Sequence, residues 1–257
     1  MTAPLLSVRN LTKRFGTTMA CSGISLDLWP GEVLGIVGES GSGKTTLLQC
    51  VAGLQSADEG SIHYHPDDGR RVDLSTLDEP ALRRMQRTEW ALIHQHPHLG
   101  LRMSVSAGAN IGERLMANHW QHYGKIRGEA VKWLEAVEID SSRIDDLPST
   151  YSGGMQQRLQ IARNLVSMPK LVFMDEPTGG LDVSVQARLL DLIRSLVRKY
   201  GLSVVIVTHD LAVARLLSSR LVVMRHGEII EEGLTDQVLE DPQSAYSQLL
   251  VSSILQV

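Results

Sequence analysis

The stretch Gly-Glu-Ser-Gly-Ser-Gly-Lys-Thr at residues 38–45 constrains the fold of this chain more than any other feature. It follows the apolar run VLGIV at 33–37 and precedes the helical pattern TTLLQCVAGL. The order is therefore strand, loop and helix. In such a loop, glycines let the backbone N–H groups close around phosphates, and the start of the helix adds positive potential. We expect Lys44 to reach the β and γ phosphates of a nucleotide and Thr45 to offer its hydroxyl to Mg²⁺. The alternative is a Gly/Ser-rich turn with a solvated lysine.

Two adjacent carboxylates, Asp175 and Glu176, end a second apolar run, LVFM at 171–174. Successive side chains of a strand point to opposite faces, so two acids at its end can perform different tasks. Asp175 is suited to bind Mg²⁺, directly or through water, and Glu176 to polarise an attacking water molecule. A solvated acidic turn is the alternative.

Two further polar residues follow apolar runs. His209 comes after SVVIVT, and Gln95 comes after ALIH. Ligands of open α/β sheets bind beyond the carboxyl ends of the strands. His209 is therefore a candidate γ-phosphate sensor, with a packing histidine as the alternative. Gln95 could bind Mg²⁺ or the attacking water, although the residue would be weak evidence by itself.

A second candidate phosphate site is Ser152-Gly153-Gly154, where YSGGMQQR opens a helix. A hydroxyl and free N–H groups at the positive end of a helix suit a phosphate. An ordinary serine N-cap explains the same pattern equally well.

The order of the patterns predicts an α/β fold. Alternation in LLSVR and ISLDL predicts antiparallel strands, with GTTMAC as the turn region between them. The four apolar runs predict buried, largely parallel strands. VSVQARLLDLIRSLVRKY, at 183–200, has apolar residues at helical spacing and predicts a helix. LVVM-RHG-EIIEEG predicts a hairpin that turns at His226-Gly227. We predict one domain over 1–257: an α/β core of 1–96 and 161–235, a helical subdomain at about 97–160, and a helical tail at 236–257.

Composition and charge exclude several classes of protein. The formal net charge of -4 and pI near 6.1 give no global positive field of the kind that draws proteins to nucleic acid. The N-terminal residues lack the basic region and long apolar stretch of a secretory signal. No apolar run approaches the roughly 18 residues of a membrane helix. We therefore expect a cytoplasmic protein whose two cysteines, Cys21 and Cys50, are reduced. Cys50 lies among apolar neighbours, which favours a buried thiol over a reactive one.

The chain resembles an ATP-binding-cassette (ABC) domain, which is a P-loop NTPase. The resemblance rests on motifs that occur in one order: the P-loop at residues 38–45, Gln95, SGGMQQR, FMDEPT, GGLD and His209. The resemblance implies Mg²⁺ and ATP as ligands, ATP hydrolysis, and a head-to-tail homodimer in which each ATP lies between one copy's P-loop and the other's signature motif. It makes Ser152 to Gln156 the signature, Gly180 to Asp182 the D-loop and His209 the switch histidine. Phe15 matches the aromatic residue that stacks on adenine, with a core phenylalanine as the alternative.

The resemblance thus assigns three sets of residues. Those assigned to the nucleotide are Phe15, Gly38, Glu39, Ser40, Gly41, Ser42, Gly43, Lys44, Thr45, Thr46, Ser152, Gly153, Gly154, Met155, Gln156 and Asp182; those assigned to Mg²⁺ are Thr45, Gln95 and Asp175; those assigned to catalysis are Glu176, His209 and Gln95.

The chain departs from the common pattern at two places. Tyr151 and Met155 replace the more usual Leu and Gln, and Gly179-Gly180 precede Leu181-Asp182 where Ser-Ala or Gly-Ala is common. The phosphate-facing Ser152, Gly153 and Gly154 are retained, so we expect an active site.

A closer resemblance is to the ATP-binding subunits of the bacterial carbon–phosphorus lyase system, which works in phosphonate breakdown. It rests on HQHPHLGLRMSVSAGANIGERLMA, on the stretch from RIDDLPSTYSGGMQQR to LLDLIRSLV, and on LTDQVLEDPQSAYSQLLVSSILQV. Such subunits dock as a pair on a soluble enzyme core that contains the radical lyase subunit. This chain would then be an accessory ATPase, because two separated cysteines cannot hold a radical cluster.

The alternative is the ATPase of a peptide- or nickel-type importer, whose C-terminal pattern resembles DPQSAYSQLL. The segment from His96 to Tyr123 distinguishes the two, and we expect it to face the partner, with Arg102 and Arg114 contributing charge. A solvated helical surface without a partner is the alternative. An ATPase acting on DNA or ribosomes is disfavoured by the acidic balance.

Overall fold

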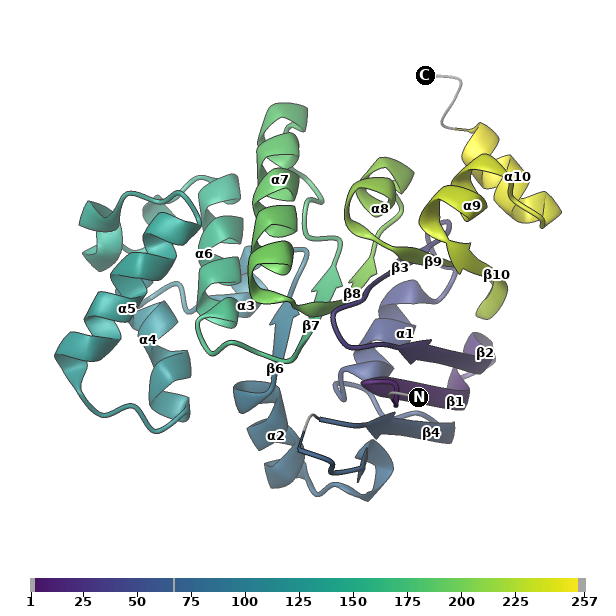
Figure 1. Cartoon of the computed structure of the whole chain (residues 1–257), viewed down its shortest axis with the longest axis horizontal. Helices are drawn as coiled ribbons and strands as arrows, with labels where there is room; N and C mark the ends of the chain where they lie inside the picture. The colour runs from purple at the N-terminus through teal and green to yellow at the C-terminus, as the bar shows by residue number, and fades with distance from the viewer. Residues whose placement is uncertain (1–2, 67, 254–257) are drawn as a thin grey trace. The chain divides into compact units, whose positions relative to one another are not determined.

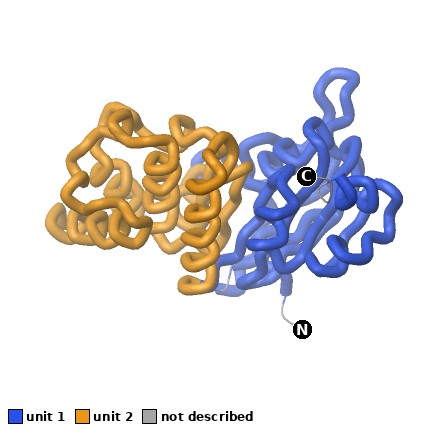
Figure 2. The backbone as a smooth tube through the Cα atoms, turned by 90° about the horizontal axis from the view of Figure 1, so that it is seen from above, with its two compact units in different colours: residues 1–82, 201–257 blue, residues 83–200 orange. Residues whose placement is uncertain are grey.

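The computed structural model describes residues 3–66 and 68–253. The chain forms two compact units, residues 1–82 with 201–257 and residues 83–200 (Figure 2). The predicted division into a core, a helical subdomain and a tail stays a prediction, and its residues 1, 2, 67 and 254–257 lie outside the described part.

The first unit contains an antiparallel sheet, with strand order β2-β1-β4-β5 (Figure 1). Its strands are β1 (Leu6–Phe15), β2 (Thr18–Leu28), β4 (Glu59–Tyr64) and β5 (Val72–Asp73). β1 pairs with β2 on one edge and β4 on the other, both antiparallel. Both runs are therefore confirmed as antiparallel strands. Burial alternates only in β2, whereas Leu6, Ser7 and Val8 of β1 are all buried.

The same unit contains β3 (Val33–Val37), which runs directly into the P-loop. β3 is parallel to both β8 (Ser203–Val207) and β9 (Arg220–Arg225), and β9 turns back into β10 (Glu228–Leu234). Every residue of β3 and β8 is buried, as their continuous apolar runs predict. Gly35 permits the contact between strands, because a Cβ there would lie 2.5 Å from the Leu221 side chain. The helices are α1 (Lys44–Val51), α8 (Leu211–Leu217), α9 (Thr235–Glu240) and α10 (Ala245–Ser252).

The second unit combines a parallel strand pair with helices. β6 (Trp90–Ile93) pairs with β7 (Leu171–Asp175). Its helices are α3 (Pro97–Gly100), α4 (Ala107–Ala117), α5 (Tyr123–Ala136), α6 (Gly153–Leu165) and α7 (Val183–Tyr200), with 3₁₀ turns at Ser141–Asp145 and Pro148–Thr150. α7 has the predicted bounds, and its leucines and Ile193 form a buried stripe at helical spacing. The helix α2 (Glu79–Thr88) lies across the boundary between the units.

The predicted α/β fold with N-terminal antiparallel strands is confirmed, and so is the hairpin. His226 and Gly227 have φ of 48° and 83°, as a two-residue turn with a primed conformation requires. The prediction that GTTMAC is the turn region is wrong. β2 begins at Thr18, so only Gly16 and Thr17 connect the two strands. The sequence analysis also missed β4, β5 and α2, whose short or strongly polar stretches give little periodic apolar signal.

Both cysteines are buried and unpaired, which confirms the expectation for Cys50. Burial raises the pKa of Cys21 to about 12 and that of Cys50 to about 11, so both thiols stay protonated at neutral pH. Within residues 3–66 and 68–253, no helix combines the length and apolar character that a membrane crossing needs.

Candidate functional site

The P-loop lies between β3 and α1 in the first unit, and its glycines are dictated by close backbone contacts. Gly38, Gly41 and Gly43 have φ of 148°, 79° and 102°. A Cβ at Gly38 would lie 2.2 Å from the Met224 carbonyl oxygen, and one at Gly43 would lie 2.1 Å from that of Ala20. A side chain at either position would force the loop open. The sequence motif therefore corresponds to a tight backbone loop.

Lys44 is the first residue of α1, and its ammonium is folded back over the loop. Nζ donates to the carbonyl oxygens of Gly38 (2.8 Å) and Glu39 (2.7 Å), and to Ser42 Oγ (3.4 Å). The Lys44 side chain is buried, so the solvated-lysine alternative is wrong. The loop thus holds a positive charge beside the backbone N–H groups of a helix start, which is an arrangement that suits phosphate.

Three other candidates of the first unit, Phe15, Thr45 and His209, are exposed. Phe15, at the end of β1, is 49% exposed, so the core-phenylalanine alternative is wrong and a ring face is accessible to a base. The Lys13 ammonium lies 5.5 Å from its ring centroid. His209 follows β8 and is exposed, which excludes a packing histidine. Asp210 beside it caps α8 through Ala212 N–H (2.8 Å). Thr45 is exposed and Thr46 partly buried.

In the second unit, the carboxylate of Glu176 is in contact with Gln95. Gln95 Nε2 donates to Glu176 Oε2 at 3.0 Å. Glu176 has a φ of 43°, a left-handed conformation that is uncommon for a residue with a side chain. Gly179 explains one departure from the family pattern, because a Cβ there would lie 2.9 Å from Gln95 Nε2. Gly179 thus leaves space for the glutamine that touches the proposed base, whereas Gly180 has a φ of 75°, which favours glycine for its backbone conformation.

The signature segment forms a capped helix start. Ser152 Oγ accepts a hydrogen bond from Met155 N–H (3.3 Å), and both Ser152 and Gly153 are exposed. The N-cap interpretation is therefore confirmed, and it leaves the other N–H groups of this turn directed outward from the helix end. Tyr151, the second departure, is a core residue whose hydroxyl donates to the Arg143 carbonyl (2.9 Å).

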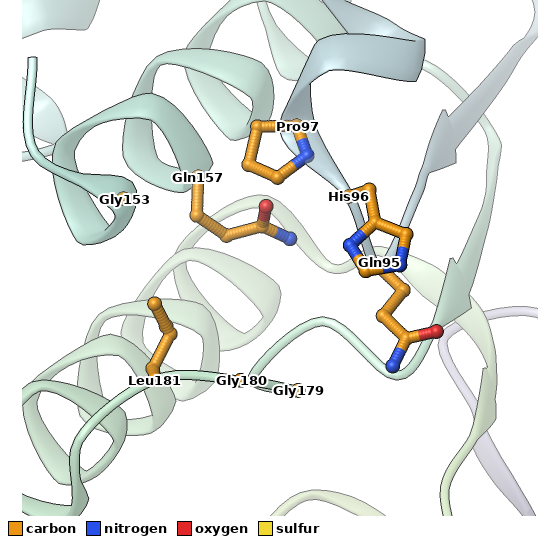
Figure 3. Close-up of a pocket in the computed structure, with 8 residues that line it drawn as sticks. All are labelled: Gln95, His96, Pro97, Gly153, Gln157, Gly179, Gly180 and Leu181. Atoms are coloured by element: carbon orange, nitrogen blue, oxygen red, sulfur yellow. The ribbon is translucent and has the colours of Figure 1, made fainter.

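Three of the predicted motif segments border one pocket of about 280 Å³ (Figure 3). It is lined by Gln95, His96 and Pro97, by Gly153 and Gln157 of α6, and by Gly179, Gly180 and Leu181. Figure 3 shows the Gln95 side chain extending toward the loop that carries Gly179 and Gly180, and the Gln157 amide pointing into the space between the segments. The structure therefore brings together Gln95, the signature and the D-loop. Asp182 follows, exposed, at the start of α7.

Two buried glutamines of α6 that the sequence analysis missed connect the signature helix to the Gln95 segment. Gln157 and Gln160 both donate from Nε2 to the His94 carbonyl oxygen (3.1 Å each). Gln160 Oε1 also accepts the His94 N–H at 2.7 Å. The backbone of His94 is thus held on both sides by the helix that Ser152 caps. The available signal was the spacing of Gln157, Gln160 and Asn164, which places three amide side chains on one face of the helix.

The expectation that Arg114 contributes charge to a partner-facing surface is wrong. Its half-buried guanidinium donates to the carbonyl oxygens of Gln86 (2.9 Å) and Arg87 (3.1 Å), and to Asn164 Oδ1 (2.6 Å). Burial, aided by the charge of Arg163, lowers the pKa of Arg114 to about 10, so it remains charged at neutral pH. Arg114 closes the last turn of α2, where free carbonyls need donors.

The family that this arrangement indicates is shown by comparison with known proteins. A model of the ABC transporter family matches residues 21–179, more than half of the chain. The chain therefore belongs to the ABC family of ATP-binding domains. It is 64% identical over 256 residues, the full length of both proteins, to the putative phosphonates utilization ATP-binding protein PhnK of Escherichia coli K12. It is thus an ABC ATPase of the PhnK type, as its sequence resemblance predicts.

More distant relatives carry transport names. The chain is 38% identical to the peptidoglycan transport ATP-binding protein YejF of Agrobacterium fabrum, over 98% of the chain and 47% of that protein. It is 36% identical to the dipeptide transport ATP-binding protein DppD of Haemophilus influenzae, over 97% of the chain and 77% of that protein.

Solved structures share the fold. The cassette MJ0796, in a dimeric post-hydrolysis state bound to ADP and Pi, superposes with a TM-score of 0.79 at 28% identity, over 90% of the chain and 98% of its own. CbiO1 of Clostridium perfringens, part of the transporter complex cbiONQ, superposes with a TM-score of 0.81 at 26% identity, over 93% of the chain and 92% of its own.

Replacing Lys44 with alanine should weaken ATP binding at least tenfold, because a charge-assisted hydrogen bond contributes about 1.5–3 kcal/mol. Calorimetric titration of the variant with ATP measures this loss. Lys125→Ala, at an exposed lysine in the other unit, is the matched control and should bind as the wild type does. An unchanged affinity in Lys44→Ala would show that phosphate binds elsewhere.

Proposed function

We propose that this chain hydrolyses ATP with Glu176 as the general base, as a homodimer, and that it transmits the resulting change to a soluble carbon–phosphorus lyase core in the cytoplasm. Two observations carry the chemical part: the buried lysine of the phosphate loop in the first unit, and the glutamate after β7 that Gln95 contacts in the second unit. The 64% identity to a phosphonate-utilization protein supports the biological part.

Each group has a distinct task in the proposed reaction. Lys44 and the loop N–H groups bind the phosphates, and Phe15 stacks on the adenine. Glu176 accepts a proton from the attacking water, while Gln95 orients its carboxylate through the 3.0 Å hydrogen bond. His209 contacts the γ-phosphate. Asp182 contacts the nucleotide that is bound between the two copies of the chain. In the partner copy, Ser152 and the following N–H groups bind the same γ-phosphate from its open side.

The residues assigned to Mg²⁺ fit that ion by their chemistry. A threonine hydroxyl, a carboxylate and an amide oxygen are hard oxygen donors of the kind that Mg²⁺ prefers. Because Gln95 uses Nε2 to contact Glu176, its amide oxygen is the atom available to a cation. Thr45, Asp175 and Gln95 would hold the ion, which supplies charge neutralisation at the β and γ phosphates.

Replacing Glu176 with glutamine should slow ATP hydrolysis by about 10²-fold or more and leave ATP binding intact, because the shape is kept and the general base is lost. Phosphate release and calorimetric titration measure the two effects on the same preparation. Glu135→Gln, at an exposed glutamate of α5, should hydrolyse ATP at the wild-type rate. Near-normal turnover in Glu176→Gln would exclude Glu176 as the base.

The surface that we propose for docking is the segment from His96 to Tyr123. It exposes four large apolar side chains: Leu99, Met116, Trp120 and Tyr123 are 63%, 55%, 41% and 73% exposed. Exposed apolar side chains of this kind favour a protein partner over a solvated surface. The segment begins next to Gln95, which contacts the proposed catalytic base, so a change at the nucleotide can reach it directly.

Two exposed arginines, one within this segment and one beside it, contribute positive charge. Arg102 lies within the segment, 3.8 Å from the Glu113 carboxylate. Arg87 is exposed at the end of α2, and its carbonyl is bound by Arg114 of α4, which places the end of α2 beside the segment. A partner with acidic groups opposite these two positions would be recognised by the complementary charge.

Charge reversal at Arg87 and Arg102 together should reduce capture of the lyase core at least tenfold without changing ATP affinity. Tagged chain expressed with the untagged lyase proteins, purified and quantified by mass spectrometry, tests this. Arg198→Glu, an exposed arginine of α7, is the matched control.

Two outcomes would contradict the docking proposal. The first is normal recovery of the lyase core by the double variant. The second is recovery of membrane permease subunits by the wild type. That result would favour a role in a peptide- or nickel-type importer, a class to which the transport names of the relatives YejF and DppD also point.

A further inference from the structure

The C-terminal helix α10 is in direct contact with the P-loop, although it follows the P-loop by about 200 residues in the sequence. The backbone N–H of Glu39 donates to the hydroxyl oxygen of Tyr246 at 3.2 Å. Tyr246 is 6% exposed and packs in a cluster with Val37, the last residue of β3, and with Val223 of β9. All of these residues belong to the first unit.

Tyr246 and Lys44 hold opposite ends of one peptide group. The carbonyl of Gly38 and the N–H of Glu39 belong to the same planar unit. Lys44 Nζ binds the carbonyl at 2.8 Å, and Tyr246 binds the N–H at 3.2 Å. Rotation of this peptide would break both contacts together. The hydroxyl of Tyr246 therefore fixes the carbonyl that positions the Lys44 ammonium.

The ring of Tyr246 is itself held in place. The Arg225 guanidinium lies 4.7 Å from its centroid, at the end of β9. Val238 of α9 belongs to the same buried cluster, and Leu250 and Val251 of α10 pack against it. The hydroxyl can therefore present a fixed acceptor to the loop.

A carboxylate anchors the start of α10. Glu231 of β10 accepts the backbone N–H groups of Gln243 (2.8 Å) and Ser244 (2.9 Å). Ser244 in turn caps the helix by accepting the Ser247 N–H at 3.0 Å. Burial opposes the charged form of Glu231, but these hydrogen bonds outweigh it and its pKa lies below the ordinary value. The anchor is therefore charged at neutral pH.

We propose that Tyr246 is a positioning residue for nucleotide binding, and that the C-terminal helix, anchored by Glu231, prepares the P-loop and its lysine for phosphate. The tail pattern that resembles importers then has a task at the nucleotide rather than at a permease. A loop that occupies the binding conformation only part of the time binds with an affinity reduced by that fraction. One neutral hydrogen bond of this kind corresponds to a factor of about two to ten in an equilibrium constant.

Tyr246→Phe removes the hydroxyl and keeps the ring, so it tests this role with little risk to folding. We expect the dissociation constants of ATP and ADP to rise by the same factor, about three- to tenfold, because the contact acts on the loop and not on the γ-phosphate. The turnover rate at saturating ATP should stay within about twofold of the wild type, so that KM changes and kcat does not.

Three further variants complete the test. Tyr200→Phe makes the same chemical change on α7, and Leu249→Ala alters an exposed side chain of α10; both should bind nucleotide as the wild type does. Glu231→Gln should weaken binding in the wild-type background but add less than twofold to Tyr246→Phe, because the two act through one contact.

The proposal rests on nucleotide binding at the P-loop, and its failure is distinguishable from failure of that function. Wild-type protein that binds no ATP would overturn the proposed function itself. Wild-type binding with an unchanged affinity in Tyr246→Phe, or an equal loss in Leu249→Ala, would overturn only the role of Tyr246.

Discussion

The contact between the Lys44 ammonium and the carbonyl oxygens of Gly38 and Glu39 is the interaction on which the nucleotide chemistry of this chain depends. A buried charge is costly unless hydrogen-bond acceptors surround it, and the tight loop provides them before any phosphate arrives. That loop can close only because Gly38 and Gly43 have no Cβ. The apolar strand β3, the glycines and the first turn of α1 therefore act together to place a positive charge where we propose that phosphates bind.

The second unit contains a comparable arrangement around a negative charge. Gln95 meets Glu176, Gly179 leaves the space for that contact, and the glutamines of α6 hold the backbone of the neighbouring His94. The signature helix and the segment that continues into the proposed docking surface are thus joined by hydrogen bonds. This continuity gives a physical reason for linking the state of the nucleotide to a protein partner.

The sequence predicted the P-loop, the buried strands and α7 because each combines a local pattern with a specific chemical requirement. It also identified the family, because several short motifs occurred in one order. It could not separate the Ser152 N-cap from a phosphate site, since one geometry serves both. Arg114 shows the main limit: an arginine near the end of a helix looks solvent-facing in the sequence, and only the fold shows that it closes the end of α2. The contact between Tyr246 and Glu39 depends on the tertiary fold and leaves no local signal.

The central claim is that two copies of the chain enclose ATP between the P-loop of one and the signature of the other. Light scattering on the Glu176→Gln variant, which should retain bound ATP, tests it most directly. We expect a mass near twice 28.3 kDa with Mg²⁺ and ATP, and the mass of a single chain with Mg²⁺ and ADP. Adding Ser152→Arg should return the ATP sample to a single chain, because a bulky cation would fill the helix end that faces the partner's phosphate. Dimers that persist in this double variant, or that form equally with ADP, would contradict the account.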